Sequence, residues 1–141
     1  MSAYKIIECN FTDQETLLEA LSTLGFVPDV FTEPVNLKGY QGDTRKEVAH
    51  IIIPKEQVNK FTGASNDIGF LWNEKSQKYD FICSNYDKKL QMDVRIIQVY
   101  VKLVLEKSLK KQGYKIKVNI NDEDFLKKQI NDLNMVARKL I

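Results

Sequence analysis

The sequence is poor in the side chains that most catalytic and metal sites need. It contains one histidine and two cysteines, and no second Cys or His stands at metal-ligand spacing from either cysteine. A histidine-dependent nucleophilic mechanism would therefore rest entirely on His50, which we expect to be an ordinary residue of a strand. We expect no metal and no cofactor, and we expect Cys9 and Cys83 to be buried free thiols.

Long apolar runs are also missing from the chain. No stretch approaches the roughly 18 apolar residues of a membrane span, and the N-terminus lacks the basic flank and apolar block of a signal peptide. The 141 residues are 43% apolar and 28% charged, a composition that suits one folded domain over residues 1–141. These features predict a soluble intracellular protein with no membrane partner.

Charge is nearly balanced in total but uneven along the chain. The net charge of +2 is too small to imply a nucleic-acid or membrane partner. Residues 1–90 carry 10 basic and 13 acidic side chains, whereas residues 91–141 carry 11 basic and 6 acidic ones. Most of the basic excess comes from six lysines: Lys102, Lys107, Lys110, Lys111, Lys115 and Lys117. A solvated helix face near a helix C-terminus explains them, and the alternative is a patch that binds phosphate or acidic groups.

Hydrophobic alternation bounded by turn-forming residues predicts seven extended segments. They are Tyr4–Phe11, Asp29–Leu37, Val48–Ile53, Ile68–Trp72, Tyr79–Cys83, Tyr114–Ile120 and Met135–Ile141. Pro34 removes one ladder hydrogen bond from the second segment, which favours an edge position in the sheet. The polar stretch 55–65 is expected to be a loop.

Three helices are expected between these strands. A capping box over Thr12–Glu15 opens the first, and Gly25 ends it. Asp93–Lys111 is rich in β-branched residues, but its 19 residues exceed an ordinary strand, so we predict one long helix. A short helix is expected from Asp122 to about Asp132.

This order of elements predicts an α+β fold. One mainly antiparallel sheet would carry the long helix and the shorter helices on one face. The opposite face of the sheet would then be exposed to solvent or bound to a partner. An exposed edge at Pro34 or at the C-terminal strand would allow a homodimer.

The most distinctive segment is a glycine-framed loop made of Gly39, Tyr40, Gln41, Gly42, Thr44 and Arg45. Glycines allow positive φ and close backbone approach, and the Arg45 guanidinium offers a planar fork to a carboxylate or phosphate. An anion-binding loop is one interpretation. The other is a tight turn into the next strand, with Arg45 paired to Asp43 or Glu47.

A second signal lies in the segment Asp67–Asn73. Gly69 within a strand marks a bulge or a close approach of another chain segment. Phe70 and Trp72 share one face of this strand, so they are either ordinary core aromatics, which we favour, or a stacking platform for bases.

These two motifs carry a resemblance to a known family. The chain resembles the hypothetical chloroplast open reading frame thirty-five proteins of red-algal plastids and cyanobacteria, whose bacterial relatives are a domain of unknown function. The shared features are Gly39–Gly42 with Thr44-Arg45, the Asp67–Asn73 strand, Tyr79, Tyr100 and Gln112–Tyr114. The resemblance spans Tyr4 to Tyr114, supports the long helix and fades over residues 115–141. Ser84 stands where the family usually has an acid.

The resemblance brings no established activity. It implies a protein partner, because such genes can accompany AAA-type ATPases, and it places the chain in a cytoplasm or a plastid stroma. Our leading hypothesis is a non-enzymatic binding or adaptor module whose loop, with Asp67 and Trp72, engages an anionic group on a protein partner.

Two other classes of function are weighed against this one. A nucleic-acid-binding module would use the C-terminal lysines, with Phe70 and Trp72 for stacking. A small hydrolase or nuclease would use Asp67, Arg45 and His50, but it lacks a second acid at a defensible spacing.

Overall fold

The computed structural model describes residues 3–111. The five strands of this part are β1 (Tyr4–Phe11), β2 (Asp29–Lys38), β3 (Thr44–Ile53), β4 (Ile68–Asn73) and β5 (Lys78–Ser84). The four helices are α1 (Gln14–Thr23), α2 (Lys55–Thr62), α3 (Asn85–Lys89) and α4 (Met92–Lys111). The elements expected at 114–120, 122–132 and 135–141 lie outside the described residues.

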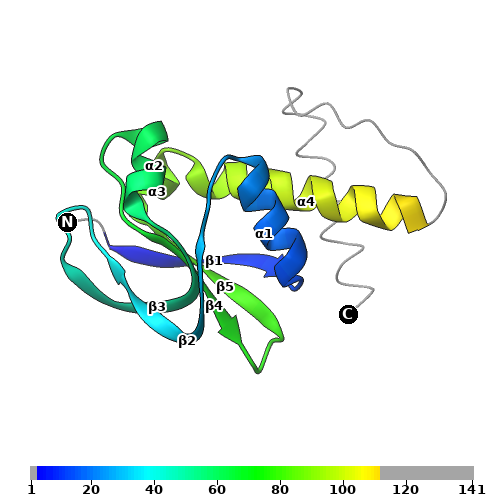
Figure 1. Ribbon diagram of the computed structural model, residues 1–141, viewed down its shortest axis with the longest axis horizontal. Coiled ribbons are helices and arrows are strands. Elements are labelled where there is room, and N and C mark those ends of the chain that lie inside the picture. Colours follow the sequence, from blue (N-terminus) through cyan, green and yellow to red (C-terminus); the bar gives the residue numbers. More distant parts are fainter. Residues whose placement is uncertain (1–2, 112–141) are drawn as a thin grey trace.

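The strands form one antiparallel sheet in the order β1-β5-β4-β3-β2. Helices α1 and α4 pack together across one face of this sheet (Figure 1). The fold is therefore α+β with an antiparallel sheet and helices on one face, as the sequence predicts. No helix of the described part is long and apolar enough to cross a membrane.

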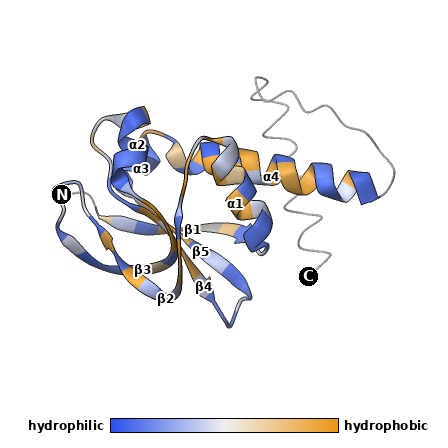
Figure 2. Ribbon diagram, in the orientation of Figure 1, coloured by the Kyte–Doolittle hydropathy of each residue, from blue (hydrophilic) through white to orange (hydrophobic). Residues whose placement is uncertain are grey.

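The core lies between the sheet and α4. Its centre is an aromatic cluster in which the ring of Phe11 lies 5.5 Å from Phe70 and 4.7 Å from Tyr100. The residues of α4 that are buried near this cluster, Ile96, Val99 and Tyr100, recur every three to four positions, which is the helical repeat. The β-branched segment is thus a helix, because burying one face along its length outweighs its strand propensity. Figure 2 shows the apolar colouring concentrated on the central strands and the first turns of α4.

Two helices were not expected from the sequence. The loop prediction for 55–65 is wrong, because Lys55–Thr62 forms α2, which buries Val58 and ends at Gly63 with φ +86°. Helix α3 begins after Ser84, whose hydroxyl accepts a hydrogen bond from the Asp87 amide at 3.1 Å. The Ser84-x-x-Asp87 spacing is a capping signature that would have predicted this start.

The capping box expected at Thr12–Glu15 is also wrong. Helix α1 begins at Gln14, and Asp13 at its N-cap makes no side-chain cap. The amides of Thr12 and Asp13 instead donate to the hydroxyl of Tyr100, at 3.2 and 3.3 Å. Gly25 ends this helix with φ +89°, as predicted.

The β2–β3 hairpin bends over the face of the sheet that the helices leave open. Between the pairs Val30–Ile51 and Val35–Ala49 the edge strand β2 gains three residues relative to β3, and Pro34 lies within them. Leu37 is fully buried on this face. A Cβ on Gly69 would lie 2.9 Å from Leu37 and 2.7 Å from the Cβ of Ala49, which explains the glycine in β4 as a site of close approach.

Candidate binding site at the β2–β3 hairpin

The tip of the hairpin is a tight turn held by its own backbone. The Gly39 amide donates to the Asp43 carbonyl at 2.8 Å, and the Gly42 amide donates to the Gly39 carbonyl at 2.9 Å. Gly42 has φ +82°, and a Cβ on Gly39 would collide with the Asp43 carboxylate. The geometry of the turn therefore requires glycine at position 42, whereas a Cβ at position 39 would have to displace the Asp43 side chain.

Tyr40 is the residue that this turn presents to solvent. Its amide donates to the Asn66 side chain at 2.9 Å, and its side chain is turned outward with 51% of the residue exposed. The amides of Gly39, Tyr40 and Gly42 all donate to acceptors of the protein itself. An anion at the tip would therefore be met by side chains rather than by these amides.

Arg45 is mostly buried, whereas Tyr40 is exposed. Its guanidinium lies over the ring of Tyr4 in β1, 5.1 Å from the ring centre, and Nη1 lies 3.8 Å from the Asp43 carboxylate. The Arg45 side chain is only 15% exposed. Arg45 therefore pairs with Asp43, which is the arrangement that the tight-turn interpretation describes. The sequence does not reveal the inward direction, because Tyr4 is far away in the chain.

Asp67 fastens the base of the hairpin. Its two carboxylate oxygens accept hydrogen bonds from the amides of Lys38 and Lys55, both at 2.8 Å. Burial raises the pKa of this carboxyl, and the two amide donors oppose that rise. The Asp67 carbonyl accepts a hydrogen bond from the Tyr4 hydroxyl at 2.8 Å. Asp67 thus joins the end of β2 to the start of α2 and to β1.

A buried polar network continues behind Asp67. Asp87, which is fully buried, accepts hydrogen bonds from the Ser84 hydroxyl at 2.7 Å and from the Asn66 amide at 3.4 Å. Burial raises the pKa of Asp87, whereas hydrogen bonds from Ser65, Ser84 and Asn66 lower it. Sequence analysis missed this network. The polar run Ser65-Asn66-Asp67 before a buried strand was its visible signal.

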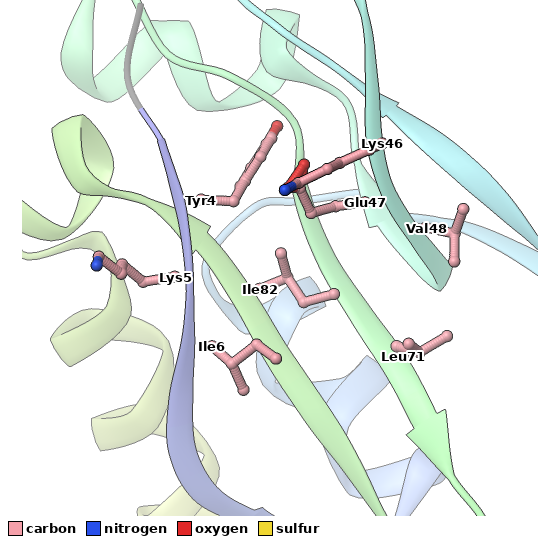
Figure 3. Close-up of a pocket in the computed structure, with 8 residues that line it drawn as sticks. All are labelled: Tyr4, Lys5, Ile6, Lys46, Glu47, Val48, Leu71 and Ile82. Carbon is pink, nitrogen blue, oxygen red and sulfur yellow. The ribbon is translucent and has the colours of Figure 1, made fainter.

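A groove lies on the open sheet face beside the hairpin. One wall is Tyr4–Ile6 of β1 and the other is Lys46–Val48 of β3, with Leu71 and Ile82 between them (Figure 3). Its volume is about 340 Å³. Tyr4 lines the groove and its ring also contacts Arg45 of the hairpin, so the groove adjoins the hairpin.

Trp72 does not join this surface. It packs against the helix side of the sheet, where its ring lies 5.0 Å from that of Tyr79. Phe70 is fully buried on the same side. Both aromatics therefore pack in the core, as the favoured interpretation of the sequence predicts. His50 lies in β3, and its Nδ1 accepts a hydrogen bond from the Trp72 amide at 3.1 Å.

The described lysines of α4 lie far from the hairpin. Helix α4 runs toward the end of the molecule opposite the β2–β3 turn (Figure 1). Lys107 pairs with Glu19 of α1 at 2.8 Å, and Lys102 lies 3.7 Å from Glu106. Lys115 and Lys117 lie outside the described residues. The loop and the lysines that are described do not form one site.

Neither cysteine is prepared for nucleophilic chemistry. Cys83 is buried, Cys9 is half-buried, and both are free. Burial raises the pKa of Cys9 to about 12 and also raises that of Cys83, so both thiols stay protonated at neutral pH. Within residues 3–111, no three His, Cys, Asp or Glu side chains gather in a way that would hold a metal ion.

A family model described as a protein of unknown function, DUF1257, matches residues 20–128. The chain belongs to the DUF1257 family. The matched part of this DUF1257 protein includes the glycine-framed hairpin, Asp67, Asp87 and the long helix, whereas Tyr4 precedes it. No curated protein and no solved structure matches the chain.

Proposed function

We propose that this DUF1257 protein is a non-enzymatic binding module that engages an anionic group on a protein partner through the tip of the β2–β3 hairpin. The observation that carries this proposal is the exposed ring of Tyr40 on a backbone fixed by Asn66. Exposed aromatic side chains on rigid backbone are frequent anchors of protein interfaces, because they lose little conformational entropy on binding.

The positive charge beside Tyr40 comes from lysines. Lys38 is exposed, and its ammonium donates to the Thr44 hydroxyl at 2.6 Å. The hydrogen bond to Glu56 raises the pKa of Lys55, and the nearby Asp67 and Tyr40 raise it further. Lys55 is paired with Glu56 at 2.7 Å, so Lys38 takes the role of the anion partner and Arg45 positions the hairpin.

The contacts of the three candidate catalytic residues favour binding over hydrolysis. Asp67 accepts two backbone amides, Arg45 lies over Tyr4, and His50 accepts the Trp72 amide. Each side chain thus has a structural partner. The Glu56 carboxylate acts on the pKa of Asp67, but it is paired with Lys55 at 2.7 Å.

We further propose that the chain belongs to the branch of the family formed by the hypothetical chloroplast open reading frame thirty-five proteins. The glycine-framed hairpin and the Asp67–Asn73 strand support this finer assignment. An AAA-type ATPase is then the first partner to test, in a cytoplasm or a plastid stroma.

The test is a binding measurement between the full chain and a purified AAA-type ATPase of the source organism. Tyr40→Ala should weaken binding about tenfold or more, because loss of an aromatic anchor typically costs about 2 kcal/mol. Phe61→Ala is the matched control, since Phe61 of α2 is an aromatic with similar exposure, 49%. Equal binding by the Tyr40 and Phe61 variants would refute the assignment of the hairpin tip.

A further inference from the structure

A chain of hydrogen bonds joins the hairpin tip to the buried carboxyl of Asp87. The Tyr40 amide donates to Oδ1 of the Asn66 side chain at 2.9 Å. The Asn66 amide in turn donates to Oδ2 of Asp87 at 3.4 Å. Asn66 and Asp87 are both buried. A single residue therefore connects the backbone that presents the Tyr40 ring to an ionisable group in the interior.

The two oxygens of the Asp87 carboxyl have different surroundings. Oδ2 accepts hydrogen bonds from the Ser84 hydroxyl at 2.7 Å and from the Asn66 amide. Oδ1 is buried and has no hydrogen-bond partner within residues 3–111. This pattern is typical of a protonated carboxyl, in which one oxygen accepts hydrogen bonds and the other carries the proton. Proton loss leaves charge on a buried oxygen that has no donor, which is costly in the interior unless the neighbouring donors move or water enters.

The elements around Asp87 bring other titratable and charged groups close to it. They are Tyr4 of β1, Cys83 of β5, Lys88 of α3, Asp93 of α4 and Asp67 before β4. Burial and the charge of Asp87 raise the pKa of Tyr4 and of Cys83, so both stay protonated at neutral pH. Asp67 has an amide donor on each carboxylate oxygen, which suits its ionised form. Asp87 differs from Asp67 in that its charge has no donor on one oxygen.

We propose that Asp87 is a pH-sensitive switch for the hairpin tip, in which proton loss displaces Asn66 and loosens the backbone that presents Tyr40. This inference rests on the proposed function in one respect, that the regulated event is partner binding at the tip. Burial raises the pKa of Asp87, so this carboxyl keeps its proton at pH values where an exposed aspartate has lost it. The tip is therefore firmly held at acidic pH and loosens as pH rises through the pKa of Asp87.

The test is an NMR pH titration of the full chain, which needs no partner. The carboxyl carbon of Asp87 reports its ionisation, and the amide signal of Tyr40 reports the state of the tip. We expect both signals to shift with the same midpoint, above the unfolded value of about 3.9. A Tyr40 amide signal that does not follow the ionisation of Asp87 would overturn the inference.

Asp87→Asn gives the second arm of this test, because asparagine has a similar shape and cannot ionise. The titration of the Tyr40 amide should be lost in this variant. Asp80→Asn is the matched control, since Asp80 of β5 is a half-buried aspartate that accepts a hydrogen bond from Asn73 at 3.3 Å. The control should keep the titration. Amide spectra establish that both variants are folded, and a wild-type titration in folded Asp87→Asn would also overturn the inference.

Binding to the ATPase separates this inference from the proposed function. Wild type should bind more weakly as pH rises through the Asp87 midpoint, and Asp87→Asn should lose this pH dependence. If Tyr40→Ala binds as well as wild type while the wild-type Tyr40 amide follows Asp87, the tip is not the binding site and the coupling stands. If Tyr40→Ala loses the ATPase while the wild-type amide does not follow Asp87, the switch alone fails.

Discussion

The guanidinium of Arg45 in β3 lies 5.1 Å from the ring centre of Tyr4 in β1, although β5 and β4 lie between these two strands in the sheet. The contact is reached because the bulged β2–β3 hairpin bends across the open face. It fixes the hairpin tip relative to the groove, which Tyr4 lines.

Arg45→Ala should therefore loosen the hairpin. Loss of the contact between Arg45 and Tyr4 removes about 0.5–2 kcal/mol of cation–π stabilisation, which should lower the free energy of unfolding measured in urea. Arg45→Lys keeps the positive charge and should retain part of this stabilisation. Identical unfolding curves for wild type and Arg45→Ala would contradict this account.

Asp87 should make the protein less stable as pH rises. Burial raises the pKa of Asp87 in the folded state, so the folded protein binds this proton more tightly than the unfolded chain does. Its stabilising effect is complete below the unfolded value of about 3.9 and is lost as pH rises through the folded pKa. Urea titrations at a series of pH values measure this slope.

Asp87→Asn should flatten that dependence of the free energy of unfolding on pH. Glu33→Gln is the control, since Glu33 is exposed in β2. An Asp87→Asn variant with the wild-type slope would show that other groups set the pH dependence.

Gly69→Ala should destabilise the sheet by about 1–3 kcal/mol, as expected for overpacking. The added Cβ would lie 2.7 Å from the Cβ of Ala49, closer than carbon atoms pack. Adding Ala49→Gly removes this closest contact. The double variant should therefore be more stable than the sum of the two single-variant effects predicts. Strict additivity of the two changes in thermal unfolding would argue against the clash.

The lysines of α4 should bind nucleic acid weakly or not at all. Lys107 and Lys102 are already close to Glu19 and Glu106, which lowers the local positive charge. Polarisation titrations with short single and double strands at low salt should show no binding. Affinity that falls steeply with salt would favour the nucleic-acid alternative instead.

The sheet and its helical layer could be predicted because local patterns decide them. Alternation in Ile68–Trp72 and Tyr79–Cys83 predicts a hairpin, and the structure pairs Trp72 with Tyr79. Pro34 predicts an edge strand, and β2 is at the edge of the sheet that residues 3–111 form. Helix α2 escaped prediction because Val58 is its only buried residue, which leaves almost no hydrophobic repeat to detect.

The candidate site was predictable in its residues but not in their directions. The glycines around Tyr40 indicate a turn with an exposed ring, and Tyr40 is exposed. The inward direction of Arg45 depends on Tyr4, and the role of Asp67 depends on the amides of Lys38 and Lys55. Such partners are brought together by tertiary packing, so spacing along the chain cannot specify them.

The irregular stretch of β2 around Pro34 has a consequence for colloidal behaviour. Its three extra residues interrupt the row of amides and carbonyls that a neighbouring molecule would need to extend the sheet. Open-ended fibril growth from this side is thereby discouraged, even where Val30 and Val35 are exposed.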